Sequence, residues 1–256
     1  MAGAVRAALG SETMTVLSTR DLTRTYGSGQ ALVRAVDGVD LEIDKGETVS
    51  VMGPSGCGKS TLLYLLGGLE RASAGEIRLG GERVDRLSET RWARLRRHSI
   101  GFVFQAFHLV DELTAVENVE LPALLAGASS ATARRRALTL LDRVGLADQA
   151  RRLPSALSGG QRQRVAVARA LANEPLVVLA DEPTGNLDSA ATVEVLRLFA
   201  ELRQAGQTLV LVTHDGRVAA SGDRLLTMRD GSIVDQTRLG AAQSPLDGMV
   251  GLGEMQ

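Results

Sequence analysis

The chain contains the stretch Gly53-Pro54-Ser55-Gly56-Cys57-Gly58-Lys59-Ser60, and its fold can be worked out from there. Glycines, a lysine and a serine at this spacing are typical of a loop whose backbone amides wrap around a phosphate. The apolar segment Thr48–Met52 before the loop predicts a buried strand, and Lys59–Leu66 after it predicts a helix. The positive N-terminal end of such a helix favours a bound anion. The stretch therefore predicts a nucleotide-binding core of the α/β class.

The last two residues of this stretch have distinct expected roles. Lys59 would reach the β and γ phosphates of a nucleotide, and the Ser60 hydroxyl would hold Mg²⁺. The chain has 29 basic residues, of which only Lys45 and Lys59 are lysines. Because lysine is a compact charge on a flexible stem and arginine a wide planar fork, a lysine at position 59 indicates a requirement for a point charge.

A second apolar segment, Val177–Ala180, ends in the two carboxylates Asp181 and Glu182. At the C-terminal end of a buried strand, Asp181 is well placed to ligate Mg²⁺ or to accept a hydrogen bond from its bound water. Glu182 is then the natural general base for an attacking water. An isolated Asp-Glu pair is commonly a solvated turn, so this interpretation depends on the phosphate loop in the same chain.

A third segment, Leu157-Ser158-Gly159-Gly160-Gln161, is expected to open a helix that runs to about Ala172. The free amides at the start of this helix predict a second anion site. A Ser-Gly-Gly turn is ordinary by itself. Its position between the phosphate loop and the acidic strand is what makes it informative.

Composition narrows the class of protein. With 44% hydrophobic residues among 256, the chain can bury a sizeable core, and no apolar stretch approaches the roughly 20 residues of a spanning helix. The net charge of −1 and the 3% of aromatic residues give no reason to expect nucleic acid as a partner. Cys57 is the only cysteine, so no disulfide can form within the chain, which fits a reducing cytoplasm.

Strand and helix patterns alternate along most of the chain, which predicts a mostly parallel sheet with helices on its faces. Strand-like patterns at Val16–Leu22 and Ala31–Ile43, with a hairpin at Glu76–Val84, predict an additional antiparallel β subdomain. From Thr114 to about Val144 the pattern is helical, with Pro122 and the loop at 127–130 expected to divide it.

These patterns predict one domain over residues 16–236, with a helical subdomain inserted at about 105–172. Residues 1–15 are expected to form an N-terminal extension and residues 237–256 a loose tail. Met1–Met14 lacks the apolar core of a signal peptide, and the sequence leaves open whether Met1 or Met14 is the true start.

The order of these motifs resembles that of ABC ATPases, and the resemblance covers residues 16–236. Leu157–Gln161 looks like the signature motif of that family, and Asp181 and Glu182 look like its Walker B pair. The remaining matches are Tyr26 to the adenine-stacking A-loop aromatic, Gln105 to the Q-loop, Leu187-Asp188 to the D-loop and His214 to the switch histidine.

The resemblance implies a P-loop NTPase fold with a RecA-like, mostly parallel sheet, and ATP with Mg²⁺ as its ligands. It implies catalytic roles for Glu182, His214 and Gln105, and metal contacts for Ser60, Gln105 and Asp181. The expected nucleotide contacts are Tyr26, Gly53, Pro54, Ser55, Gly56, Cys57, Gly58, Lys59, Ser60, Thr61, Ser158, Gly159, Gly160, Gln161 and Asp188.

In that family the signature segment faces the phosphate loop of a second subunit, so a single chain holds half of each working site. The resemblance therefore implies a second copy or a paralogous ATPase as partner, and a membrane permease that the pair drives. It implies an ATPase at the cytoplasmic face of the membrane, attached peripherally through that permease.

The segment 181–188, Asp-Glu-Pro-Thr-Gly-Asn-Leu-Asp, is similar to a subgroup of lipoprotein-release, macrolide-efflux and antimicrobial-peptide-export ATPases. Two other functions remain open: the ATPase of a permease-like regulator of cell division, and a soluble ABC ATPase of DNA repair, translation or iron–sulfur assembly. The sequence specifies neither the substrate nor whether the machine imports, exports or transmits force.

Overall fold

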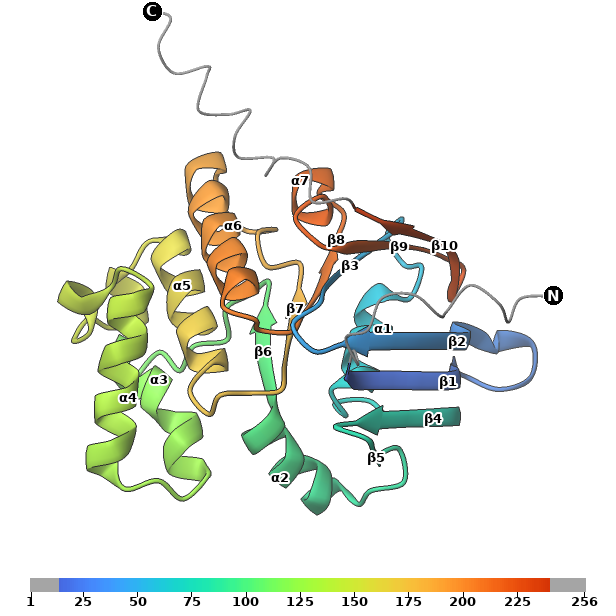
Figure 1. Ribbon diagram of the computed structural model, residues 1–256, viewed down its shortest axis with the longest axis horizontal. Coiled ribbons are helices and arrows are strands. Elements are labelled where there is room, and N and C mark those ends of the chain that lie inside the picture. The colour runs from blue at the N-terminus through green and yellow to red at the C-terminus, as the bar shows by residue number, and fades with distance from the viewer. Residues whose placement is uncertain (1–13, 240–256) are drawn as a thin grey trace, which may run out of the picture.

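A six-stranded sheet forms the centre of the computed structural model, which describes residues 14–239 (Figure 1). All of its neighbouring strands run parallel except the last two along the chain, which form an antiparallel hairpin. The strand order is β10 (Ser232–Arg238), β9 (Arg224–Arg229), β3 (Thr48–Met52), β8 (Leu209–Thr213), β7 (Val177–Asp181) and β6 (Ile100–Phe104). The mostly parallel sheet expected from the alternating pattern is therefore present.

A second, antiparallel sheet lies to one side of the first (Figure 1). Its strand order is β2 (Val33–Asp44), β1 (Thr15–Tyr26), β4 (Ala74–Leu79) and β5 (Glu82–Arg83), with a short 3-10 turn η1 at Gly29–Ala31 between the two long strands. Helix α1 (Lys59–Leu66) contacts β2 of this sheet and β7 and β8 of the central sheet. The helix that follows the phosphate loop is thus held between both sheets.

The inserted helices form a separate layer on the opposite side of β6 and β7 from the antiparallel sheet (Figure 1). They are α3 (Ala115–Leu125), α4 (Ser130–Arg143) and α5 (Gly159–Ala170), with short turns η2 (Ala147–Gln149) and η3 (Pro154–Ala156) between the last two. The remaining helices are α2 (Glu89–Ser99), α6 (Ser189–Gln204) and α7 (Gly216–Ala219).

The central strands carry apolar side chains on both faces, because helices or a second sheet cover each face. In β7, Val177 and Leu179 pack toward α1 and the antiparallel sheet, whereas Val178 and Ala180 pack toward α5 and α6. All four are fully buried. A strand buried in this way holds its C-terminal residue, Asp181, in a fixed position.

Helices α2 to α7 begin at side-chain caps, whereas α1 begins at Gly58 without one. Ser88 caps α2 by accepting a hydrogen bond from the Arg91 amide. Thr114 and Glu117 form a reciprocal capping box at the start of α3. The hydroxyl and backbone amide of Thr114 both donate to the Glu117 carboxylate and lower its pKa.

Three predicted boundaries are wrong. Pro122 lies inside α3 instead of dividing the helical region, because packing against α4 and α5 holds the helix together despite the hydrogen bond that proline cannot donate. Strand β10 continues to Arg238, so Thr237 and Arg238 are paired strand residues rather than tail. Thr15 pairs with Asp44 in β1 rather than belonging to an extension. The rest of both expected end segments, 1–13 and 240–256, lies outside the described residues.

Candidate functional site

The loop between β3 and α1 is closed around its own lysine. The ammonium of Lys59 donates to the carbonyl oxygens of Gly53 at 2.9 Å and Pro54 at 2.8 Å, and the side chain is 7% exposed. Gly58 has φ +102°, and a Cβ there would lie 1.9 Å from the carbonyl oxygen of Ala35. Only glycine fits that position. Gly58 thus lets the loop pass close to Ala35, and the loop surrounds the buried Lys59 ammonium.

Asp181, at the end of β7, receives two hydroxyl groups from α1. The Ser60 hydroxyl donates to Oδ1 and the Tyr64 hydroxyl donates to Oδ2, each at 2.8 Å. Burial, and next the hydrogen bond to Asp181, raise the pKa of Tyr64 to about 12, because the contact with the Asp181 carboxylate favours the protonated phenol. The sequence did not single out Tyr64, although its i,i+4 spacing from Ser60 places both on one face of α1.

The donor atoms at Asp181 suit Mg²⁺. Magnesium prefers oxygen ligands and is usually held by one or two carboxylates together with substrate phosphates and water. Ser60 and Asp181 supply a hydroxyl and a carboxylate next to the phosphate loop. Within residues 14–239 no group of three or more His, Cys, Asp or Glu side chains could hold a metal ion alone. The residues present therefore fit a magnesium ion that is shared with a nucleotide.

Glu182 and His214 form a pair at the ends of two neighbouring strands. Glu182 follows β7 and His214 follows β8, and the Nδ1 atom of His214 lies 2.9 Å from Oε2 of Glu182. The backbone amide of His214 donates to the same oxygen at 3.3 Å. Glu182 has φ +46°, a left-handed conformation that is uncommon outside glycine and asparagine. Its strained backbone turns the carboxylate back toward the next strand.

These residues surround one cavity of about 400 Å³. It is lined by Ala35, Ser55, Gly56, Gly58, Lys59, Ser60, Thr61, Gln105, Glu182 and His214. The phosphate loop, the expected base and the expected switch histidine, which come from distant parts of the sequence, therefore meet at one hollow. Asp181 lies directly behind it through its bond to Ser60.

Gln105 is held at the cavity by a partner that the sequence analysis did not identify. Its side-chain amide donates to Oδ1 of Asn186 at 3.1 Å, and Nδ2 of Asn186 donates to the Gln105 carbonyl at 3.1 Å. Asn186 lies in the turn between Glu182 and α6. No sequence spacing could have revealed this contact, because 81 residues separate the two side chains.

Several expected nucleotide contacts lie away from this cavity. Ser158, Gly159, Gly160 and Gln161 form the N-terminus of α5, where Ser158 is exposed and forms a capping box with Gln161. Asp188 is exposed and caps α6 by accepting from the Ala191 amide at 2.8 Å. Tyr26, at the end of β1, is 37% exposed, with the Arg24 guanidinium 4.4 Å from its ring centroid. None of them lines the cavity around Lys59.

The side chain of Cys57 points away from the cavity. Its side chain is 5% exposed and packs in the core between the sheets. Its sulfur lies 3.9 Å from the Lys59 ammonium and behind Gly53. We therefore assign the thiol to packing.

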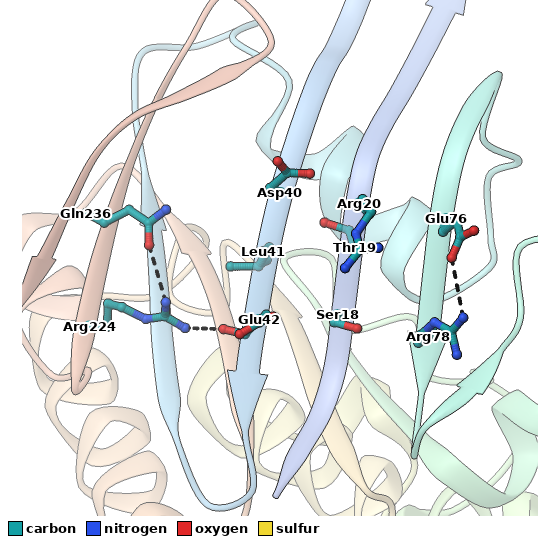
Figure 2. Close-up of a pocket in the computed structure, with 10 residues that line it drawn as sticks. All are labelled: Ser18, Thr19, Arg20, Asp40, Leu41, Glu42, Glu76, Arg78, Arg224 and Gln236. Atoms are coloured by element: carbon teal, nitrogen blue, oxygen red, sulfur yellow. Dashed lines mark hydrogen bonds and ion pairs between the residues drawn. The ribbon is translucent and has the colours of Figure 1, made fainter. Parts of the chain in front are cut away.

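A second hollow of about 400 Å³ lies on the outer face of the antiparallel sheet and β9 (Figure 2). Some of its charged side chains pair with groups of the same hollow: Arg224 donates to Gln236 and to the carbonyl of Glu42, and Arg78 pairs with Glu76. It has neither a phosphate loop nor a catalytic carboxylate pair. The cavity at Lys59 is therefore the candidate site.

A comparison with protein families matches residues 36–185 to the family described as ABC transporter. The match covers the phosphate loop, Gln105, the signature segment and the Asp181-Glu182 pair. The chain belongs to the ABC transporter family. It is 48% identical to an uncharacterized ABC transporter ATP-binding protein of Thermotoga maritima, over 88% of this chain and 96% of that protein.

Other relatives in the ABC transporter family carry functional names. The lipoprotein-releasing system ATP-binding protein LolD of Xylella fastidiosa is 48% identical over 87% of this chain and 93% of its own length. The macrolide export ATP-binding/permease protein MacB of Sodalis glossinidius is 48% identical over 91% of this chain, but the chain spans only 36% of it. These names match the suspected subgroup of lipoprotein-release and macrolide-efflux ATPases.

A solved structure of the ABC transporter family has the same fold. The dimeric cassette MJ0796 bound to ADP and Pi superimposes with a TM-score of 0.81 and 41% identity, covering 88% of this chain and 99% of that one. The P-loop NTPase fold of the ABC type and the assignment as an ATP-binding ATPase subunit are therefore confirmed. Among the described residues no helix has both the length and the apolar character to cross a membrane.

Proposed function

We propose that this chain is an ATP-driven motor subunit that closes on a second ATPase subunit across bound ATP and so drives a separate membrane permease. One observation carries the proposal. The cavity at Lys59 gathers the phosphate loop, Glu182 and His214, whereas the signature turn at Ser158 is exposed elsewhere on the surface. A second chain that presents its own signature turn would complete the cavity.

The residues around the cavity divide the chemistry among them. Lys59 binds the β and γ phosphates, and Ser60 and Asp181 hold Mg²⁺, which neutralises charge on the phosphate oxygens when bound. Glu182 takes the proton of the attacking water. His214, 2.9 Å from that carboxylate, orients it. Gln105, whose side-chain amide donates to Asn186, would be a further residue to hold the metal.

Several further contacts follow from closure on a second subunit. The free amides of Gly159 and Gly160 bind the γ-phosphate held by the other chain's lysine. Tyr26 stacks on adenine through the ring face that Arg24 leaves uncovered. Asp188 lies at the start of α6, beside the signature helix α5 that α6 contacts.

A physical connection links Gln105 to the helical layer. Arg169 of α5 is half-buried, and this desolvation lowers the pKa of its guanidinium, which donates to the carbonyls of Phe107 and His108 just beyond Gln105. The signature turn is at the other end of the same helix. A displacement of α5 therefore pulls on the segment that carries Gln105, which gives ATP-dependent closure a route to a partner on the helical layer.

A groove of about 300 Å³ between α2, β6, α3 and α5 fits a segment of the permease. Its lining includes Phe102 and Phe104, whose stacked rings are 5.4 Å apart, and the Arg169 that holds the Gln105 segment. The relatives support a permease partner, since MacB is named as both ATP-binding protein and permease and is about three times as long as the matched part. We accordingly place the chain at the cytoplasmic face of a membrane, attached through that permease.

The test is recovery of the partner from cell membranes. A tagged Glu182→Gln chain, which should retain bound ATP, is purified from membranes with Mg-ATP, and the proteins that come with it are identified by mass spectrometry. Recovery of a permease supports the proposal, and its loss with Lys59→Ala would tie the association to nucleotide. Recovery of soluble partners alone would overturn the membrane role and leave the ATPase assignment standing.

A further inference from the structure

Two hydroxyl groups on one face of α1 donate to Asp181. One belongs to Ser60 of the phosphate loop, and the other belongs to Tyr64, which lies outside that loop. Ser60 and Tyr64 are four residues apart and therefore lie above one another on the helix. Each donates to a different oxygen of the Asp181 carboxylate, at 2.8 Å in both cases. The carboxylate is thus held at both oxygens by a single helix.

The two hydroxyls differ in what else they can reach. Ser60 lines the cavity, where it can turn toward a metal ion, whereas Tyr64 is not among the cavity's lining residues. Tyr64 is therefore not a ligand of anything in the cavity. The contact by which its hydroxyl reaches the site is therefore the hydrogen bond to Asp181.

The surroundings of Tyr64 restrict its ring. It is half-buried and packs against the core between the two sheets. Its ring centroid lies 6.4 Å from that of Phe104, with the planes tilted by 58°. Phe104 ends β6, the strand that pairs with β7 and holds Phe104 opposite Asp181. Strands β6 and β7 therefore fix both the phenol and the carboxylate that it contacts.

We propose that Tyr64 is a positioning residue for magnesium: its hydroxyl fixes the Asp181 carboxylate so that the oxygen next to Ser60 faces the metal. The inference rests on the proposed role of Asp181 at the metal. Groups that hydrogen-bond to a metal-binding carboxylate set its orientation, and their loss typically lowers metal affinity by 10- to 100-fold. A tyrosine that merely fills the core would have no such effect.

The experiment measures binding rather than turnover. Binding of a fluorescent ADP is titrated in EDTA and then over a series of Mg²⁺ concentrations, with the full chain and with Tyr64→Phe, which keeps the ring and removes the hydroxyl. We expect Tyr64→Phe to bind ADP in EDTA with the affinity of the parent chain. The Mg²⁺ concentration that gives half of the Mg²⁺-dependent increase in ADP affinity should rise about tenfold. The metal-free thermal unfolding temperature of each variant is recorded alongside.

Two matched variants separate the possible failures. Thr19→Val removes another buried hydroxyl, which donates to the Val39 carbonyl in the antiparallel sheet, and it should leave the Mg²⁺ response unchanged. A shift as large as that of Tyr64→Phe would show a general stability effect and overturn the inference.

Asp181→Asn should lose the Mg²⁺ response. If it does and Tyr64→Phe responds like the parent chain, the inference on Tyr64 fails alone; if Asp181→Asn also responds normally, the metal role of Asp181 fails with it.

Discussion

The phosphate loop and the signature turn are both helix N-termini, yet the structure treats them in opposite ways. At α1 the loop bends over a lysine that is 7% exposed and bound to two backbone carbonyls. At α5 the turn begins with an exposed serine whose side chain accepts a hydrogen bond only within its own capping box. The N-terminus of α1 is therefore closed around the Lys59 charge, whereas the N-terminus of α5 lies at the surface.

The difference shows which part of the site the chain can build alone. A buried Lys59 with fixed glycines is organised for phosphate before any ligand arrives, so binding requires little rearrangement. At the signature turn only Ser158 is exposed, and its own amide donates to the Gln161 side chain, so the amides left for a partner's ligand are those of Gly159 and Gly160 at the start of the helix. The first region should therefore control nucleotide binding and the second only the steps that need a partner.

The largest effect is expected from breaking the inward-facing end. Lys59→Ala removes the charge at the centre of the loop, and loss of one member of a buried charge pair generally costs about 2–5 kcal/mol. We expect ATP affinity to fall by at least about 30-fold, and hydrolysis to be lost with it. The measurement is isothermal titration calorimetry with ATP. Lys45→Ala, which removes the only other lysine at an exposed position, is the control and should bind ATP like the parent chain.

The second effect separates binding from turnover within the same region. Glu182→Gln keeps the size of the side chain and its contact with His214, but it removes the base. Hydrolysis should fall by about 10²–10⁴-fold with ATP affinity retained. Phosphate release and calorimetry measure the two quantities, and light scattering should show an ATP-dependent dimer. A variant that hydrolyses ATP at the parental rate would contradict the assignment of the base.

The third effect tests the outward-facing end by itself. Ser158→Arg places a bulky charge at the signature turn while leaving the Lys59 cavity intact, so ATP should still bind but the dimer and hydrolysis should be lost. Mixing it with Lys59→Ala should restore activity, because a mixed dimer joins the intact cavity of one chain to the intact turn of the other.

The size of this recovery follows from the symmetry of the dimer. Since neither variant is expected to form a dimer with itself, the dimers in an equal mixture are mixed, and each has one complete site out of two, so recovery of up to about half of parental hydrolysis is expected. The readout is ATPase activity over a series of mixing ratios. If the mixture stays as inactive as its components, the two regions do not meet across a dimer.

The sequence predicts the elements of the inward-facing region with little error, for a physical reason. Thr48–Met52 and Lys59–Leu66 have the predicted bounds because a short apolar run and an adjacent glycine loop leave few alternatives. The fold class followed from this local pattern together with the alternation of strands and helices. Pro122 was misread because tertiary packing overrides a local helix-breaking tendency.

What the sequence could not provide are contacts between segments far apart in the chain. The bonds of Tyr64 to Asp181 and of Gln105 to Asn186 span 117 and 81 residues. They depend on the pairing of β6, β7 and β8, which no local pattern specifies. The left-handed backbone of Glu182 could not be predicted either, because glutamate has no preference for that conformation. The sequence motifs thus predict the role of each site residue, whereas the side chains that position those residues are found only in the folded structure.

The smallest effect concerns stability on the inward-facing side. Asp215 follows His214 and caps α7, accepting from the backbone amide of Arg217 at 2.8 Å and from its guanidinium at 2.7 Å. The Arg217 side chain is the main cause of a lowered Asp215 pKa. Since the folded pKa lies below the unfolded value of about 4, the stabilisation is present above pH 4 and is lost as the pH falls through the folded pKa.

Asp215→Asn retains a capping oxygen and removes the charge, so it isolates this ion pair. Arg217 is 49% exposed, and solvent screening limits the expected loss to about 0.5 kcal/mol at pH 7. Urea unfolding of both proteins at pH 7 and at successively lower pH measures the difference, which should shrink below pH 4. A difference that stays constant with pH would mean that the charge of Asp215 does not stabilise the turn after His214. A change in ATP affinity at pH 7 would show instead that this turn belongs to the preformed nucleotide region.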